Sequence, residues 1–571
     1  MTMRRPTIKE KVPNYLHPFI AEQDSSLYTA IDHASWRYIM RVSKTFFARH
    51  AHQKYVNGLA ETGISTECIP RIEDMDAKLE QFGWRACAIV GFIPPAVFME
   101  FLSLGILPIA CDMRRHEHLA YTPAPDIVHE AAGHAPVIAD REYADYLYEY
   151  GEVARKVIFS DQDMALYEAI RLLSDIKEAP QSTAVDIADA QVRLEAATAK
   201  VTYASEATQL SRMGWWTIEY GLVGDLNDPK IYGAGLLSSL SESFHCFGAD
   251  VKKIPFSVDC IEMSFDITRP QPQLYVTPDF QTLRDGLEQF ASTLAFRRGG
   301  LLGLKKAQQS ATVTTAELDS GLQIGGLLEE VIKAPDGQPA YLRYHGACQL
   351  ARGDIELEGH GPKYHAQGFG SPLGKLRRGK SPQDLTDGEI RRLSGWLEFE
   401  SGVTVEGTFV KSVREGERAL VLVFEKCTVT MGDRVLFQPE WGTYDMACGA
   451  AVTSVFGGPP DRGSYLAATG GYTQAPARPK SNLTPENREI NKLYEKVRQL
   501  RESSKAGNAY PDSIQAIIRE LDEHHANDWL LRLELLEFKG EWQTHLRQHL
   551  TELAAHHADL KEMIERGLAA L

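Results

Sequence analysis

Two histidines five residues apart and one distant glutamate place the strongest constraint on this chain. His129 and His134 lie in the segment PDIVHEAAGH, and Glu219 follows in GWWTIEYG. Two imidazoles and one carboxylate on one face of a metal ion leave the opposite face open, an arrangement typical of non-haem Fe(II) oxygenases. A fold that uses these three residues together must bring two remote segments to one point.

Two other interpretations of the histidine pair compete with a metal site of this kind. Zinc peptidases, which are hydrolytic metalloenzymes, carry H-E-x-x-H on a helix, and His129-Glu130 begins in that way. The spacing here is i, i+5, about 140° apart on a regular helix, so the match fails. Gly133 is expected to interrupt the helix and let His134 turn back towards His129. In the structural interpretation, the two histidines are ordinary polar side chains with satisfied hydrogen bonds.

Four blocks of sequence surround these residues. They are IVGFIPPAVF at 89–98, YTPAPDIVHEAAGHAP at 121–136, WTIEYG at 216–221 and YGAGLLSSLSE at 232–242. In these blocks and in this order the chain resembles the pterin-dependent aromatic amino acid hydroxylases, with weaker similarity from about residue 28 to about residue 296. The resemblance implies a monooxygenase that uses Fe(II), O2 and a tetrahydropterin (tetrahydrobiopterin or a related pterin). In such an enzyme the metal and the cofactor carry the difficult chemistry, and the protein positions the reactants.

The resemblance assigns the metal ligands and one carboxylate behind them. It makes His129, His134 and Glu219 the iron ligands. Asp126, three residues before His129, matches a carboxylate that fixes the orientation of an imidazole. An aspartate ahead of a helical segment is also a favoured N-cap, and the two roles are compatible.

The resemblance also assigns the substrate site. An amino acid substrate needs a planar cation for its carboxylate, and Arg114 matches that clamp. Arg115 and His116 crowd the same stretch, but the count back from the YTP block favours Arg114. For the serines, helix-end or packing chemistry is the alternative role. The substrate-binding residues implied in this way are Arg114, Thr122, Pro125, Asp126, Trp215, Ser238 and Ser239.

Four residues are implied as contacts of the pterin. Phe98 matches a ring that stacks on the cofactor, which adds about 0.5–1.5 kcal/mol beyond the burial of area. Gly91 and Ile93 match backbone hydrogen bonds, and Glu130 matches a polar contact. From its spacing alone, Phe98 in VFMEFL would be a core residue.

The identity of the substrate is narrowed by a few positions. Pro108 stands as in bacterial phenylalanine-hydroxylating members of the family, and this favours conversion of L-phenylalanine to L-tyrosine. Ala131, Ala132 and Gly214 stand where bulkier residues are common, and smaller side chains there would enlarge the pocket. Tryptophan, another aromatic amino acid or another ring position therefore remains an alternative. A non-catalytic binding or scaffold protein with a vestigial metal site is the alternative of another class.

The predicted fold class is α+β, with three regions. Residues 1–300 are expected to form a mainly helical catalytic domain with a helical insertion at about 160–210, and no regulatory domain is expected. Residues 318–475 are expected to form a β-rich domain, because VTVEGTFV and ALVLVFEKCTVTM flank the charged turn REGER like a hairpin. Residues 484–571 are expected to be helical, with Thr484 as N-cap and Pro485 at the first helical position.

Composition excludes several classes of protein. Acidic residues outnumber basic ones by 77 to 61, which argues against a nucleic-acid surface. The eight cysteines form no CxxC pair, which suits a reducing compartment, and no apolar run is long enough for a membrane span. We therefore expect a cytoplasmic protein without nucleic-acid or membrane partners. The family resemblance, and not the composition, implies a small-molecule aromatic amino acid as its substrate.

The sequence does not determine several features of the second half of the chain. The amphipathic C-terminal helices are expected to pack within the chain, with homo-oligomer formation through them as the other possibility. The pairs His524-His525 and His556-His557 are expected to be solvated. The glycine-rich segment GHGPKYHAQGFGSPLG at 359–374 is a weak candidate for a nucleotide loop.

Overall fold

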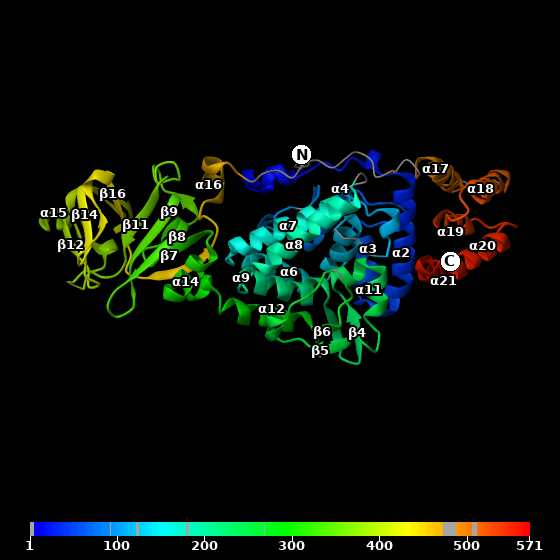
Figure 1. Ribbon diagram of the computed structural model, residues 1–571, viewed down its shortest axis with the longest axis horizontal. Coiled ribbons are helices and arrows are strands. Elements are labelled where there is room, and N and C mark those ends of the chain that lie inside the picture. Colours follow the sequence, from blue (N-terminus) through cyan, green and yellow to red (C-terminus); the bar gives the residue numbers. More distant parts are fainter. Residues whose placement is uncertain are drawn as a thin grey trace.

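The computed structural model of the chain describes residues 5–91, 93–120, 125–178, 182–267, 269–377, 379–471, 483, 487–504 and 511–571. They form three regions in a row: a central region (5–310), a β-rich region (313–469) at one end and the C-terminal helices (487–571) at the other (Figure 1). The expected α+β class is confirmed. None of the described helices is long and apolar enough to cross a membrane. The predicted caps Thr484 and Pro485 lie outside the described residues.

The central region is mainly helical, with two small sheets. Its longest helix, α2, begins with a capping box in which Thr29 and Asp32 exchange hydrogen bonds. β1 and β2 pair in parallel, and the other sheet has the order β4-β3-β6-β5. The elements are α1 (Ile8–Lys11), α2 (Ala30–His50), α3 (Tyr55–Glu61), α4 (Ile72–Leu79), β1 (Arg85–Ile89), α5 (Pro95–Ser103), β2 (Ile106–Ala110), α6 (Arg141–Ala154), α7 (Asp161–Glu178), α8 (Ala184–Ala199), α9 (Glu206–Gly214), β3 (Leu222–Asp225), β4 (Asp228–Ile231), α10 (Ala234–Ser238), α11 (Leu240–His245), β5 (Lys252–Pro255), β6 (Gln273–Thr277), α12 (Phe280–Ala291), α13 (Ala295–Arg298) and α14 (Gly300–Ser310).

The segment expected as an insertion, 160–210, contains α7, α8 and the start of α9. α7 and α8 pack against each other as a pair on the outside of the central region (Figure 1). α8 begins with a capping box between Thr183 and Asp186 and buries only Ala190. A helix with so small a buried face adds little to the core that holds the metal ligands.

The β-rich region consists of two antiparallel sheets and contains two apolar cores, each of which includes residues from both sheets. One has the order β10-β9-β8-β7-β17 with β11 on β9, and the other has the order β12-β13-β14-β15 with β16 on β14. The predicted hairpin is present as β13 and β14. The elements are β7 (Val313–Leu318), β8 (Leu322–Lys333), β9 (Pro339–Arg352), β10 (Ile355–Glu356), β11 (Gly368–Pro372), α15 (Asp387–Arg392), β12 (Trp396–Glu398), β13 (Val403–Glu415), β14 (Arg418–Met431), β15 (Arg434–Phe437), β16 (Tyr444–Ala447), β17 (Val452–Gly457) and α16 (Arg462–Thr469).

A buried charge holds the β-rich region against the central region. Glu100 on α5 is 3% exposed and accepts a hydrogen bond from Arg462 Nη1 on α16 at 2.7 Å. The hydroxyl of Tyr15 also donates to Glu100. Because a buried carboxylate is costly without partners, Arg462 fixes α16 on α5, and Tyr15 ties the N-terminal segment to the same carboxylate.

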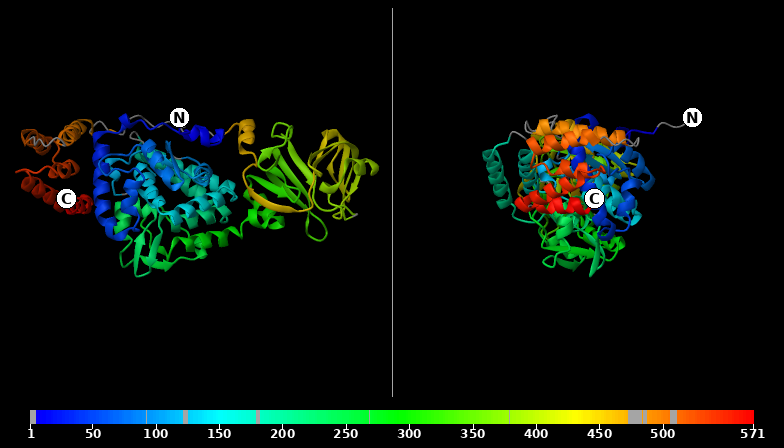
Figure 2. Two further views of the ribbon diagram at one scale, coloured as in Figure 1. Left: turned by 180° about the vertical axis from the view of Figure 1, so that it is seen from behind. Right: turned by 90° about the vertical axis from the view of Figure 1, so that its right-hand side faces the viewer.

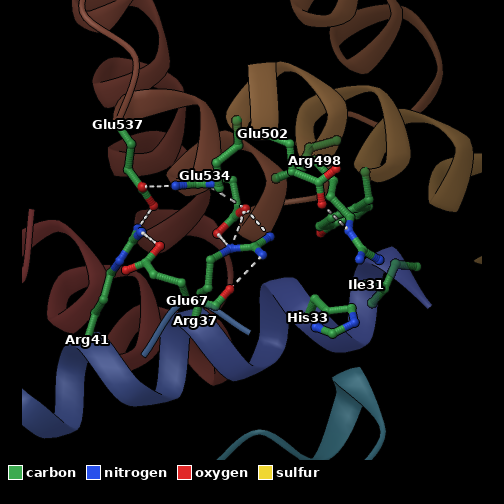
Figure 3. Close-up of polar contacts among 12 residues, drawn as sticks. Ile31, His33, Arg37, Arg41, Glu67, Arg498, Glu502, Glu534 and Glu537 are labelled. Atoms are coloured by element: carbon green, nitrogen blue, oxygen red, sulfur yellow. Dashed lines mark hydrogen bonds and ion pairs between the residues drawn. The ribbon is translucent and has the colours of Figure 1, made fainter. Parts of the chain in front are cut away.

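The C-terminal helices pack against α2 and share one apolar core with the central region (Figure 2). They are α17 (Asn487–Ser504), α18 (Pro511–His524), α19 (Leu530–Leu536), α20 (Gln543–His556) and α21 (Ala558–Ala569). Arg37 of α2 and Glu534 of α19 point towards one another inside this interface (Figure 3). Their packing within the chain agrees with the default expected from the sequence.

Candidate metal centre and substrate site

The metal-ligand candidates lie on two π-helices, Val128–His134 and Trp215–Glu219. A π-helix has i→i+5 hydrogen bonds, so residues five apart share one face. The chain therefore does not break at Gly133 as expected; it stays helical, with a wider turn. Gly133 is needed for close packing instead, because a Cβ there would lie 2.8 Å from the carbonyl oxygen of Ala234 on α10.

Three side chains with metal-donor atoms meet between the two π-helices. The Nε2 atoms of His129 and His134 are 3.3 Å apart. The carboxylate of Glu219 lies 3.4 Å from each of them, through Oε2 to His129 and through Oε1 to His134. Donors about 2.1 Å from one metal ion at right angles would be about 3 Å apart, so this set fits a single divalent ion.

The charge states of these groups suit a metal. Burial alone would raise the pKa of Glu219, but the two imidazoles outweigh it and lower that pKa to about 2. Burial lowers the pKa of His129 to about 4. Burial also opposes the charge on His134, but Glu219 and Glu130 raise its pKa above the ordinary value. An ionised carboxylate beside imidazoles that exchange a proton for a metal is the state that metal binding requires.

A serine fixes the orientation of the first imidazole. His129 Nδ1 lies 3.0 Å from Ser238 Oγ, and that hydroxyl donates its hydrogen to the carbonyl of Ala234 at 2.7 Å. The hydroxyl therefore accepts from His129 Nδ1–H, which leaves the lone pair of Nε2 facing the other two donors. The sequence had suggested Ser238 as a substrate contact, and the structure places it behind the metal-ligand candidate.

Replacing Ser238 with alanine is expected to lower the affinity for Fe(II) by about 10- to 100-fold, because the imidazole loses the partner that fixes its tautomer. Equilibrium dialysis with Fe(II) or Co(II) measures this change. Ser243→Ala is the matched control, since the Ser243 hydroxyl donates to Leu240 within α11. Equal affinities in the two variants would show that Ser238 does not orient the ligand.

Arg114 is buried and tied to Asp126. Arg114 Nε and Nη2 each donate to one carboxylate oxygen of Asp126 at 2.9 Å, and Nη1 donates to the carbonyl of Ser238 at 3.0 Å. Asp126 also accepts the backbone N–H of His129 at 3.1 Å, as an N-cap does. Burial would raise the pKa of Asp126, but Arg114 outweighs it and lowers that pKa. The guanidinium is thus held rigidly beside the π-helix that carries His129.

The remaining candidates for substrate binding lie in different surroundings. Trp215 stacks on Phe265 with ring centroids 4.2 Å apart and on Tyr220 at 4.5 Å. The Ser239 hydroxyl caps α11 by accepting the N–H of Glu242. Pro125 is exposed, and Thr122 lies outside the described residues.

The small residues expected to enlarge the pocket are themselves closely packed. Ala131 and Ala132 are buried, and the Tyr55 hydroxyl donates to the carbonyl of Ala132. A Cβ on Gly214 would lie 2.4 Å from the Tyr150 hydroxyl. Tyr150 therefore occupies the room that a side chain at position 214 would take.

Three of the pterin candidates follow β1, and Glu130 lies on the first π-helix. Gly91 has φ +65° and donates its N–H to Asp112 Oδ2 at 3.0 Å. Ile93 is buried and Phe98 is half-buried on α5. Glu130 is buried 4.0 Å from His134, and burial raises its pKa to about 8.

Asp112 was missed by the sequence analysis. Its side chain holds Gly91, and its backbone carbonyl accepts the N–H of Ile127 at 2.7 Å. It therefore joins the pterin candidates to the π-helix with the histidines. The available signal was an aspartate directly after an apolar strand, in PIACDM.

One side of the donor set stays accessible. The side chains of His129 and Glu219 are 16% and 25% exposed, whereas that of His134 is 4% exposed. Buried imidazole and carboxylate donors with one accessible side fit the class of mononuclear metal enzymes that bind a co-substrate at the metal.

The sequence comparison identifies the family. The model of the family described as "biopterin-dependent aromatic amino acid hydroxylase" matches residues 2–164 and 185–305. The chain therefore belongs to this family and is a pterin-dependent aromatic amino acid hydroxylase. The described part of the unmatched stretch 165–184 includes most of α7 and the first residue of α8, in the outer helical pair.

Several relatives are similar to about half of the chain. A phenylalanine-4-hydroxylase of Mesorhizobium japonicum is 28% identical over 301 residues, 52% of this chain and 91% of the relative. One of Ralstonia nicotianae is 29% identical over 287 residues, 46% of this chain and 76% of the relative. The solved Fe(III)-bound phenylalanine hydroxylase of Chromobacterium violaceum is 24% identical, with a TM-score of 0.38, over 50% of this chain and 90% of that one.

Proposed function

We propose that this protein hydroxylates L-phenylalanine to L-tyrosine with a tetrahydropterin, O2 and Fe(II). The observation that carries the proposal is the convergence of His129 Nε2, His134 Nε2 and a Glu219 carboxylate within 3.3–3.4 Å, inside a region that belongs to a biopterin-dependent family. The similarity to curated phenylalanine-4-hydroxylases supports the choice of substrate.

The metal would be held by His129, His134 and Glu219. When bound, the iron and the pterin supply the activation of O2 that no side chain can provide. Ser238 keeps His129 Nε2 unprotonated, and the single negative charge of Glu219 would offset one of the two positive charges of the ion. The accessible side of the set leaves room for a co-substrate.

The amino acid would be oriented by the buried guanidinium of Arg114 and by the stacked ring of Trp215. Asp126 binds both the guanidinium of Arg114 and the backbone N–H of His129, so the clamp and the metal would keep a fixed separation. This rigid spacing supplies the positioning on which a reaction among several bound reactants depends.

The test is an assay of the full chain with Fe(II), tetrahydrobiopterin and O2 against phenylalanine, tyrosine and tryptophan. Product mass and ring position are recorded by mass spectrometry and NMR. We expect tyrosine from phenylalanine, with tetrahydropterin oxidised in step. Preferential turnover of tryptophan or tyrosine would overturn the assigned substrate, and absence of pterin oxidation with all three would overturn the catalytic role.

A further inference from the structure

A second histidine pair with the same five-residue spacing lies in the β-rich region. His360 and His365 occur in the loop between β10 and β11. This loop belongs to the glycine-rich segment 359–374, which is a weak candidate for a nucleotide loop from its sequence. Asp445 on β16 approaches them from the other sheet. All three side chains are buried, and one donor atom of each lies within 4.8 Å of the others. In the described part of the chain, only the cluster around His129 is comparable.

The backbone holds this loop in place. The carbonyl of His360 accepts the N–H of Leu350 at 3.0 Å, and the carbonyl of His365 accepts the N–H of Cys348 at 3.1 Å. Both donors belong to β9. The two imidazoles are therefore anchored on one strand and do not depend on the loop alone for their position.

The imidazoles face one another at the separation of a ligand pair. His360 Nδ1 and His365 Nε2 are 3.2 Å apart, and the ring planes differ by 22°. The corresponding distance between His129 and His134 is 3.3 Å. Burial lowers the pKa of His360 and lowers that of His365 to about 3.

The carboxylate of Asp445 is compensated only in part, by a hydrogen bond with Tyr364. Its Oδ1 atom is buried and accepts no hydrogen bond from any described residue. Burial raises the pKa of Asp445, and His360, Tyr364 and Lys411 oppose that rise only in part. A buried carboxylate oxygen without a hydrogen bond costs free energy, and a cation bound between Asp445 and the two imidazoles would offset that cost.

We infer that His360, His365 and Asp445 bind one divalent transition-metal ion of the zinc class. Imidazole and carboxylate donors suit such ions. Because the histidines are anchored on β9 and Asp445 lies on β16, the ion would join the two sheets of the β-rich region. Its binding free energy would then add to the stability of that region. This site is independent of the proposed hydroxylation.

The experiment counts bound metal in the full chain. Metal-free protein is dialysed against Zn²⁺, and bound zinc is measured by mass spectrometry. We expect two equivalents in the wild type and one in His360→Ala and in His365→Ala. His345→Ala is the matched control, because His345 is an exposed histidine on β9, and it should keep two. Wild-type stoichiometry in both loop variants would overturn the site.

A conservative variant separates metal loss from misfolding. Asp445→Asn keeps the size and shape of the side chain, and near-ultraviolet circular dichroism reports whether the protein is folded. We expect Zn²⁺ to raise the midpoint of thermal unfolding more in the wild type than in Asp445→Asn, and the variant to bind zinc at this site at least about 100-fold more weakly. Equal stabilisation of the two proteins by Zn²⁺ would contradict a ligand role for Asp445.

Discussion

Replacing Glu219 with glutamine is expected to lower the rate of phenylalanine hydroxylation by roughly 10²- to 10⁴-fold. Glu219 supplies the single negative charge among the three donors, and its pKa of about 2 shows how strongly the two imidazoles favour that charge. Removing one partner of a buried charge pair costs about 3–5 kcal/mol, and each 1.36 kcal/mol corresponds to a factor of ten. Glutamine keeps the shape of the side chain, so the loss reports the charge.

Initial rates of tyrosine formation and the iron content of each protein measure this effect together. Glu288→Gln is the matched control, because it makes the same substitution at an exposed position of α12. This variant should keep the wild-type rate of hydroxylation and the wild-type iron content. If the Glu219→Gln protein forms tyrosine at the rate of the control, Glu219 is not a metal ligand.

The sequence predicted which residues would meet, but not the local structure that brings them together. On a regular helix a five-residue spacing points His129 and His134 to different sides. The width of the turn at 128–134 depends on tertiary contacts: the carbonyl of Ala132 accepts from Tyr55, and Gly133 packs on Ala234. Neither contact is visible in the order of residues along this segment.

The role of Ser238 shows the same limit. The block YGAGLLSS places two serines near the site, but the sequence does not tell which direction each hydroxyl takes. That direction follows from the register of the short helix α10 and from the carbonyl of Ala234. Helix ends and serines can be recognised from the sequence, whereas hydrogen bonds over 109 residues, such as Ser238 to His129, cannot.

The β-rich region was predicted where local signals existed. Alternating apolar residues on both sides of a charged turn predicted β13 and β14. The pairing of β17 with β7 joins residues more than 130 positions apart and carries no local signal. For the same reason, the approach of Asp445 to His360 and His365 could not be inferred from the sequence.

The C-terminal helices are expected to lose stability when Glu534 is replaced with glutamine. Glu534 is 3% exposed and accepts hydrogen bonds from Arg37 Nε at 2.9 and 3.0 Å and from Arg501 Nη2 at 3.2 Å. The substitution leaves two guanidinium groups in the interface without this anion, at a cost of about 3–5 kcal/mol. We expect a lower midpoint of thermal unfolding and faster proteolysis within residues 487–571.

A control within the same interface distinguishes buried charge from surface charge. Glu502 pairs with Arg498 at 3.0 Å, but its side chain is 63% exposed, and such pairs contribute about 0.3–0.5 kcal/mol. Glu502→Gln should therefore leave unfolding and proteolysis almost unchanged. Adding Arg37→Met to Glu534→Gln should restore part of the lost stability, because it removes the cation that Glu534 compensated; Arg501 keeps its ion pair with Glu537. If the double variant is less stable than Glu534→Gln alone, packing by the arginine side chain outweighs its charge, and docking of these helices depends mainly on their apolar core.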